Sequence, residues 1–260
     1  MTRSQIGDGL RYFVDGMAVA GDGWSKPGNI VDVTAADGTV TQYQAKDVII
    51  ATGSVPVALP FLLFDGELVL SNVGALLIPE VPKHQVVIGG GVIGVELGSV
   101  WRRLGAKVTV VELAPTILPG NDEDIVKEAD KIFCKRGLEL RPGTKVTGGY
   151  RDGAHVFVDV EQHGKTETLD ADYVLVSVGR KPWLNGIDAT ARGIATGKRG
   201  EIVVDTKMRT TVPHIYAIGD AVGGKLLAHK AEEEGVIAAE VIAGHHVDMD
   251  YKSMPSVVYT

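Results

Sequence analysis

The sequence has almost no cysteine, because Cys134 is the single one among its 260 residues. These residues therefore cannot form an intrachain disulfide, and they cannot build a metal site from several thiolates. Long apolar runs are also missing, since glycine, proline or charge interrupts every candidate, and we expect no membrane-spanning segment. Basic residues are in deficit, and the formal net charge is −7. This balance argues against nucleic acid as a main partner.

Signals for secretion, metal binding and triad catalysis are lacking as well. Residues 1–20 contain no basic stretch followed by an apolar block, so a secretory signal is not expected. The seven histidines show no metal-ligand spacing, and no Ser-His-Asp arrangement stands out. We therefore predict no metal site and assign no catalytic residue. Cys134 is interpreted as a half-buried residue of a helix.

The composition that remains is typical of a globular protein with one large or two ordinary domains, since 45% of the residues are apolar and 23% are charged. A hairpin turning at Asp37-Gly38 and a buried strand at residues 45–51 are predicted first, followed by a connector at residues 55–82. Strand and helix patterns then alternate, which predicts an α/β fold with a parallel sheet. The further predicted elements are a helix at 123–136, strands near 138–148, 155–161 and 173–178, two short strand candidates within 201–218, and a helix at 226–243. The apolar face predicted for this last helix consists of Ala228, Ala231, Val236, Ala239 and Ile242.

Residues 84–112 form the clearest unit of the sequence. A buried strand at 86–88 leads into a Gly-x-Gly-x-x-Gly loop at 89–94, and a second strand at 108–111 ends at Glu112. Between them lies a helix that Gly105 ends. The apolar face predicted for this helix consists of Ile93, Leu97, Val100, Trp101 and Leu104. This order of strand, glycine loop, helix, strand and acid is the fingerprint of a dinucleotide site.

Each part of the fingerprint has a physical role in holding a dinucleotide. Gly89 permits the tight turn, Gly91 leaves room for a pyrophosphate, and Gly94 lets the helix approach the strand. The free N–H groups at the helix N-terminus attract the phosphates. Glu112 can accept hydrogen bonds from ribose hydroxyls and would repel a 2′-phosphate, and residues 113–118 contain no Lys or Arg. The sequence therefore favours NAD over NADP.

The chain also contains an internal repeat. Residues 45–53 align with residues 171–179, and the same offset places Gly38 on Gly164 and Pro56 on Pro182. Two copies of one domain type explain this pattern. The glycine loop at 89–94 belongs to the second copy, and the corresponding loop of the first copy would lie upstream of Met1. We therefore expect the chain to begin inside a domain.

Two acids allow two interpretations each. Glu96 is either an exposed acid of the helix after the glycine loop or a group that faces the nicotinamide end of the cofactor. Asp220 follows a strand end and Gly219. It is either a cap or turn residue or, in a flavoprotein, an acceptor for the ribitol chain.

Several motifs together resemble flavoproteins that bind two dinucleotides. Residues 51–54 and 210–220 are similar to their two later flavin motifs. Residues 86–101 and 227–235 resemble the dihydrolipoyl dehydrogenase family, and residues 255–260 match the run into its interface domain. The resemblance extends over residues 28–260.

The resemblance implies Rossmann-like FAD- and NAD-binding domains in three layers, with a parallel sheet and a β-meander, of which the first domain is incomplete. The implied domains are a partial FAD-binding domain and connector at 1–82, an NAD-binding domain at 83–182, and a returning segment at 183–260. The implied NAD contacts are Gly89, Gly90, Gly91, Val92, Ile93, Gly94, Val95, Glu96, Glu112, Val146 and Gly179. The implied FAD contacts are Thr52, Gly53, Ser54, Asp220, Leu226, Leu227, Ala228 and His229.

The implied activity is electron transfer from dihydrolipoamide, free or protein-bound, through a disulfide and FAD to NAD. Partners of the complete enzyme would be a second copy and a 2-oxo acid dehydrogenase complex, in the bacterial cytoplasm or the mitochondrial matrix. This sequence departs from the family, because the first glycine loop, the redox cysteine pair and the interface domain are absent from it. The alternatives are an NAD-binding module without catalytic activity, and another flavin disulfide reductase or a transhydrogenase. We expect the isolated chain to lack dihydrolipoamide oxidation and to bind FAD poorly.

Overall fold

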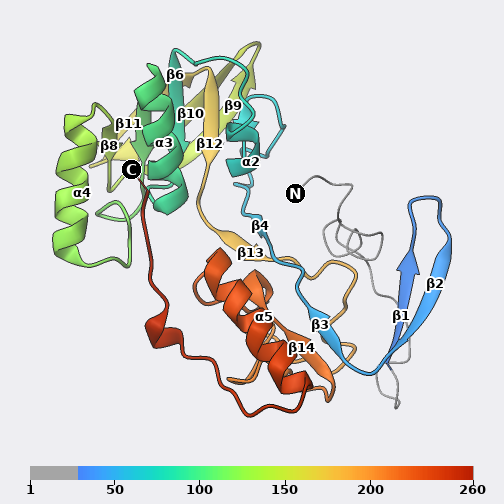
Figure 1. Cartoon of the computed structure of the whole chain (residues 1–260). Coiled ribbons are helices and arrows are strands. Elements are labelled where there is room, and N and C mark those ends of the chain that lie inside the picture. Colours follow the sequence, from blue (N-terminus) through green and yellow to red (C-terminus); the bar gives the residue numbers. More distant parts are fainter. Residues whose placement is uncertain (1–28, 260) are drawn as a thin grey trace. The chain divides into compact units, whose positions relative to one another are not determined.

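The computed structural model describes residues 29–259, which divide into two compact units (Figure 1). The first unit lies within Met1–Val55 and Lys181–Ser256, and the second within Pro56–Arg180 and Val257–Thr260. The chain thus leaves the first unit, returns to it, and contributes its last residues to the second unit again. The strands β4 (Ser54–Pro56) and β13 (Arg180–Pro182) span the first two of these three boundaries.

A parallel five-stranded sheet forms the centre of the second unit. Its strands lie in the order β5-β12-β6-β7-β8. Their bounds are Val69–Leu70 for β5, Tyr173–Val176 for β12, His84–Ile88 for β6, Lys107–Val111 for β7 and Glu139–Arg141 for β8. All its neighbouring pairs are parallel, which requires crossover connections. The predicted α/β fold with a parallel sheet is confirmed.

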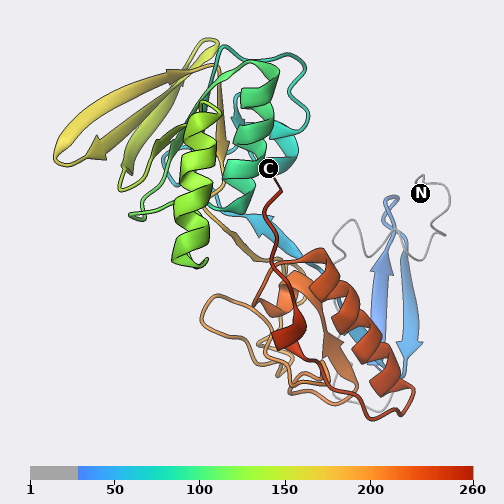
Figure 2. The ribbon, with the colours of Figure 1, turned by 60° about the vertical axis from the view of Figure 1, so that its left-hand side comes forward.

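Each face of this sheet is covered by a different layer. Val87 and Val110 pack in one apolar core with residues of α3 (Val92–Leu104) and α4 (Glu123–Lys135). Val86 and Val176 pack on the opposite side, in a core shared with the β-meander. Successive residues of a strand point to opposite faces, so a buried parallel strand is apolar throughout. The three predicted layers are therefore present, and the two green helices run side by side in Figure 2.

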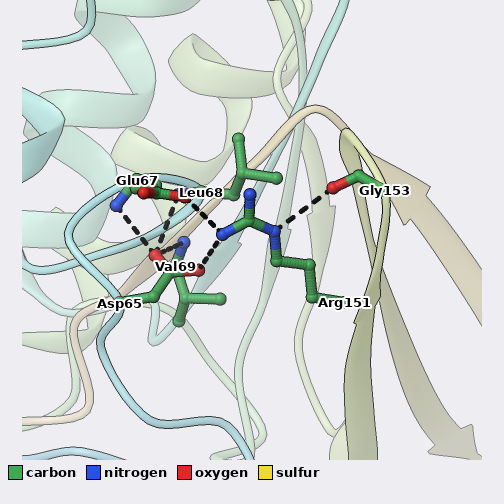
Figure 3. Close-up of polar contacts among 6 residues, drawn as sticks. All are labelled: Asp65, Glu67, Leu68, Val69, Arg151 and Gly153. Atoms are coloured by element: carbon green, nitrogen blue, oxygen red, sulfur yellow. Dashed lines mark hydrogen bonds and ion pairs between the residues drawn. The ribbon is translucent and has the colours of Figure 1, made fainter.

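The meander consists of β9 (Lys145–Asp152), β10 (His155–Gln162) and β11 (Lys165–Ala171), which pair antiparallel. The sequence did not predict β11 as a separate strand. A cluster around Asp65 ties the segment before β5 to this meander (Figure 3). Asp65 Oδ1 accepts backbone hydrogen bonds from residues 67, 68 and 69, and Arg151 donates to Asp65 Oδ2, Glu67 and the Gly153 carbonyl.

The helix α3 buries only part of the face predicted for it, since Trp101 is buried and Leu97 packs against the core. Val100 and Leu104 are exposed, at 46% and 56% of their surface, although both belong to the predicted apolar face. The buried residues are Gly94, Val95, Gly98, Ser99 and Trp101. Glycines bring the helix backbone close to the strands, as a Cβ on Gly98 would lie 3.3 Å from Val108. A prediction based on large apolar residues therefore misses a buried face that is formed partly by glycine and serine.

The first unit has less regular structure. The hairpin of β1 (Asn29–Thr34) and β2 (Val40–Ala45) turns at Gly38 as predicted. The buried strand is shorter than the predicted range 45–51, because only β3 (Val48–Ile50) pairs, in parallel with β14 (Ile215–Ala217). Of the two candidates within 201–218, only β14 is a strand, and isolated bridges replace the other. The remaining elements are the 3-10 helices η2 (Gly219–Val222) and η3 (Tyr251–Ser253) and the helix α5 (Ala228–Ile242).

The buried face of α5 also differs from the prediction. Ala228, Val236 and Ala239 of the predicted apolar face are exposed. The residues buried instead are Lys230, Glu234, Ile237 and Ala238. Two charged side chains thus occupy the side that packs into the first unit.

The residues assigned to a connector, 55–82, are not merely irregular chain. They contain β5 and the short helix α2 (Asn72–Ala75), whose Ala75 is fully buried. The predicted repeat matches the element order, since a hairpin precedes a parallel strand both in β1–β2–β3 and in β10–β11–β12. No helix among the described residues has the length and apolarity needed to cross a membrane.

Candidate functional site

The glycine loop lies between the end of β6 and the start of α3. Gly89 has a φ of +108°, and a Cβ there would lie 2.5 Å from the Ser177 carbonyl oxygen. A Cβ on Gly94 would lie only 2.0 Å from the Gly89 carbonyl oxygen. A Cβ on Gly91 would meet nothing within 4 Å. Two glycines are therefore required by packing, whereas the space at Gly91 is open for a ligand.

The first turn of α3 is suited to an anion. Gly91 is the N-cap residue, and no side chain caps the helix there. The first turn contains no acidic residue, and two arginines lie in the last turn. An uncapped N-terminus presents N–H groups and a partial positive charge, which fits a pyrophosphate. The loop residues Val92 and Ile93 are exposed and half-buried, respectively, whereas Val95 is fully buried.

Ser177 fixes the loop from the end of the neighbouring strand β12. Its hydroxyl lies 3.1 Å from the carbonyl oxygens of both Ile88 and Gly89, and its backbone N–H donates to Ile88. Ser177 was not predicted as a site residue from the sequence. No local motif marks it, because its partners lie more than eighty positions away in the chain.

Glu112 is held in place beside the loop. Its Oε2 accepts a hydrogen bond from the Gly90 N–H at 2.6 Å, and its Oε1 accepts one from the Ala114 N–H at 2.7 Å. A Cβ on Gly90 would lie 3.0 Å from the Glu112 Cβ. Each carboxylate oxygen retains a second lone pair for a further donor. The structure therefore brings the glycine loop and the predicted ribose-binding acid together.

The other predicted NAD contacts occupy three different places in the second unit. Glu96 is half-buried, and its Oε1 accepts a hydrogen bond from the Tyr259 N–H at 2.7 Å, so it is not simply a solvated helix acid. Val146 lies on β9 and packs against the core beneath the meander. Gly179 is exposed, with a φ of +123°. A small residue with an exposed backbone leaves room for a flat ring.

The predicted flavin contacts of the first unit meet at the ends of β3 and β14. The Ser54 hydroxyl donates a hydrogen bond to Asp220 Oδ2. Thr52 Oγ1 is buried and has no hydrogen-bond partner among the described residues. The Gly53 carbonyl oxygen accepts from the Trp183 N–H. A buried hydroxyl without a partner fits a site that a polar ligand completes.

The stretch from Leu226 to His229 opens α5. Leu227 is its N-cap residue, and no side chain caps the helix. Leu226, Ala228 and His229 are exposed, and His229 Nε2 lies 3.0 Å from the Pro255 carbonyl oxygen. These residues present the start of a helix that is free to contact a ligand through its backbone.

A buried ion pair on α5 escaped the sequence analysis. Lys230 Nζ lies 2.9 Å from Glu234 Oε1, and the two side chains are 2% and 0% exposed. Both also bond to the backbone of Gly219, the residue before Asp220. The spacing of four residues was visible in the sequence, but such pairs are usually exposed.

Cys134 does not resemble a redox cysteine. It lies on α4 and is exposed, so the expected half-burial is wrong. The helix turns its Phe133 inward and leaves the thiol outside. Partial desolvation and then the Asp130 carboxylate raise the pKa of the thiol, which reduces its thiolate fraction. Among residues 29–259, no group of three or more potential ligand side chains could hold a metal ion.

These features define an α/β protein that has a glycine loop of the dinucleotide-binding type in its second unit and polar side chains at the strand ends of its first unit. A family model described as pyridine nucleotide-disulphide oxidoreductase matches residues 14–235. The chain belongs to this family.

Similar proteins include dihydrolipoyl dehydrogenase 3 of Pseudomonas putida, 45% identical over 242 residues, which are 92% of this chain and 52% of the relative. Dihydrolipoyl dehydrogenase 2, mitochondrial, of Arabidopsis thaliana is 44% identical over 232 residues, 88% of this chain and 46% of the relative. The crystal structure of LpdA from Mycobacterium tuberculosis superposes with a TM-score of 0.86 at 30% identity, covering 93% of this chain and 52% of that chain. The chain thus spans about half the length of the curated relatives it matches.

Proposed function

We propose that the second unit binds NAD through the loop at 89–94, with the pyrophosphate at the N-terminus of α3 and the adenosine ribose on Glu112. The observation that carries the proposal is the pair of backbone hydrogen bonds that hold the Glu112 carboxylate beside the loop. A carboxylate fixed in this way accepts ribose hydroxyls and repels a 2′-phosphate. Val146 would lie near the adenine, and Glu96 and Gly179 near the nicotinamide.

The first unit would contribute part of an FAD site. The residues proposed to hold the flavin are Thr52, Gly53, Ser54, Asp220, Leu226, Leu227, Ala228 and His229. Bound FAD would supply two-electron redox chemistry between a dithiol and the nicotinamide. The unpartnered Thr52 hydroxyl and the oriented Asp220 carboxylate support this assignment. Residues 83–182 would form the NAD-binding domain, residues 1–82 a partial FAD-binding domain and connector, and residues 183–260 the returning segment of the FAD-binding part. The connector residues 56–82 lie in the second unit.

The parent activity we propose is that of a dihydrolipoyl dehydrogenase, which the names of the similar proteins support. Its substrate would be dihydrolipoamide, free or bound to a 2-oxo acid dehydrogenase complex, and its assembly a homodimer. The relatives include bacterial and mitochondrial proteins. The bacterial cytoplasm and the mitochondrial matrix are therefore the two proposed locations.

A second candidate function is an NAD-binding module without redox activity of its own. One observation favours it for this chain of 260 residues: its single cysteine cannot form an intrachain redox disulfide. Dihydrolipoamide oxidation by the purified chain with added FAD and NAD should therefore be absent. Measured turnover would contradict this expectation.

Two binding measurements test the proposal. Calorimetric titration should show that NADH binds the chain and that NADPH binds at least about tenfold more weakly, a difference of ~1.4 kcal/mol. Equal affinity for both would refute the role of Glu112. A visible spectrum after addition and removal of excess FAD then separates the candidates, because retained flavin bands support the flavoenzyme and a colourless NAD-binding chain supports the module.

A further inference from the structure

The ion pair of Lys230 and Glu234 is unusual because the fold encloses it completely. Taking two charges out of water is costly, and their mutual attraction offsets this cost only with good geometry and further hydrogen bonds. Such a pair is weak evidence for a stabilising role, because apolar residues of the same volume often stabilise a fold equally well. Its further contacts indicate what else it does.

Both side chains hold the backbone of Gly219. Glu234 Oε2 accepts a hydrogen bond from the Gly219 N–H at 2.7 Å, and Lys230 Nζ donates one to the Gly219 carbonyl oxygen at 3.1 Å. Gly219 has a φ of +72°. The two peptide planes that meet at this residue are therefore fixed by one acceptor and one donor from α5.

A third side chain completes the arrangement. The Tyr251 hydroxyl donates a hydrogen bond to Glu234 Oε1 at 2.7 Å. Tyr251 belongs to η3, in the segment that follows α5. Both oxygens of the buried carboxylate thus have partners, and the geometry of Glu234 is determined from two sides.

The residue that this arrangement orients is Asp220. The Gly219 carbonyl and the Asp220 N–H belong to one peptide group, so a bond to one restrains the other. The carboxylate of Asp220 meets the Ser54 hydroxyl at the end of β3, where the proposed flavin contacts gather. An error of about 1 Å in a binding group placed on such a turn weakens its bonds substantially.

We propose that Lys230 and Glu234 are positioning residues, which act through Gly219 to hold the Asp220 carboxylate in the orientation that a flavin ribitol hydroxyl requires. The inference rests on the proposed FAD site. According to this inference, the buried charges of α5 fix the geometry of the turn at Gly219 and Asp220, and they do not serve mainly to stabilise the helix.

The test compares two double variants of the full chain that differ in one hydrogen-bond acceptor. K230M/E234M replaces the pair by apolar side chains of similar volume. K230M/E234Q is also neutral, but its amide oxygen can still accept from the Gly219 N–H. The exposed neighbour Glu233 provides the control variant E233Q.

Hydrogen exchange at the Gly219 amide is the first readout. We expect exchange at least about tenfold faster in K230M/E234M than in the unmodified chain, with little change in β14, and substantial recovery in K230M/E234Q. E233Q should exchange like the unmodified chain. Equal Gly219 exchange in all four proteins would overturn the proposal. If K230M/E234M fails to fold, K230M/E234Q and Tyr251→Phe test the proposal in its place. Both should moderately speed hydrogen exchange at Gly219, and unchanged exchange in both would overturn the proposal.

Retention of FAD and the visible band shape of bound flavin form the second readout. K230M/E234M should bind FAD about tenfold more weakly than E233Q and show an altered band shape. Unchanged FAD affinity together with faster exchange would overturn the flavin role while leaving the contact with Gly219 intact. If the unmodified chain binds no FAD, the proposed FAD site itself fails, and the exchange data still decide whether Lys230 and Glu234 fix the turn.

Discussion

The Glu112 carboxylate accepts a hydrogen bond from the Gly90 N–H, with Oε2 and N 2.6 Å apart. The predicted ribose acceptor and the predicted phosphate loop are thus joined before any ligand arrives. A preorganised acceptor does not lose side-chain entropy on binding. This contact is the basis of the first prediction.

Glu112→Ala should weaken NADH binding by about 2 kcal/mol, because a charged acceptor for ribose hydroxyls is lost. It should also reduce the discrimination against NADPH. Glu112→Gln retains an acceptor without the charge, so it should relax the discrimination more than it weakens NADH. Calorimetric titration with both nucleotides measures these effects, and exposed Glu80→Ala serves as the control. Unchanged NADPH discrimination in both Glu112 variants would contradict the prediction.

Gly91→Ala and Gly94→Ala should differ in what they damage. A Cβ at Gly94 would lie 2.0 Å from a carbonyl oxygen, so this variant should lose about 3 kcal/mol of unfolding free energy or more. A Cβ at Gly91 meets open space, so that variant should fold normally and lose affinity for NADH. Denaturant unfolding and NADH titration separate the two effects. The opposite pattern would show that the pyrophosphate does not approach Gly91.

The Asp65 carboxylate should stabilise the folded state near neutral pH and lose this effect in acid. Burial by itself raises the pKa of this carboxyl, but backbone N–H groups and the Arg151 guanidinium outweigh burial and lower the pKa below its ordinary value. A lowered pKa in the folded state gives stability that is present above the unfolded pKa of ~3.9 and is lost as pH falls through the folded value. Asp65→Asn should therefore cost about 1 kcal/mol at pH 7. The difference in unfolding free energy between this variant and the unmodified chain should vanish in strong acid. Unfolding curves recorded at several values between about pH 2 and about pH 7 measure it.

Tyr251→Phe should change the alkaline limit of stability. Burial, and next the hydrogen bond to Glu234, raise the pKa of the Tyr251 phenol. A raised pKa gives stability that is complete below the unfolded value of ~10 and is lost as pH rises towards the folded one. The phenylalanine variant should lose about 1 kcal/mol at neutral pH, a modest figure because the ring is partly exposed. As the pH rises above the pKa of tyrosine in the unfolded chain, the unfolding free energy of this variant should fall less steeply than that of the unmodified chain. Thermal unfolding in alkaline buffers measures the two slopes.

Local chemistry explains which parts of the molecule the sequence predicted. The glycine loop, Glu112 and the turn at Gly38 depend on neighbours in the chain, and their spacing was sufficient. The buried face of α3 was predicted only in part and that of α5 wrongly, because glycines and an ion pair took places that large apolar residues usually occupy. Neither the packing through glycines nor the buried ion pair can be predicted without knowing the surface that each helix packs against. That surface consists of residues distant in the sequence.

Ser177 belongs to the same group of unpredicted features, since its partners lie across the sheet on another strand. The same holds for the contact between Arg151 and Asp65, which joins the meander to a segment that the sequence treated as a connector. A pattern search along the chain finds residues that act with their neighbours. It does not find residues that act across the sheet.

The hydroxyl of Ser177 has a consequence for engineering. Because the carbonyl groups of Ile88 and Gly89 are held from β12, the nucleotide loop is not a self-contained cassette. A graft of residues 84–112 into another α/β scaffold would transfer the glycines and Glu112 but not the Ser177 hydroxyl that holds the loop. Transplantation of nucleotide binding would require the host to supply a hydroxyl at the end of the adjacent strand.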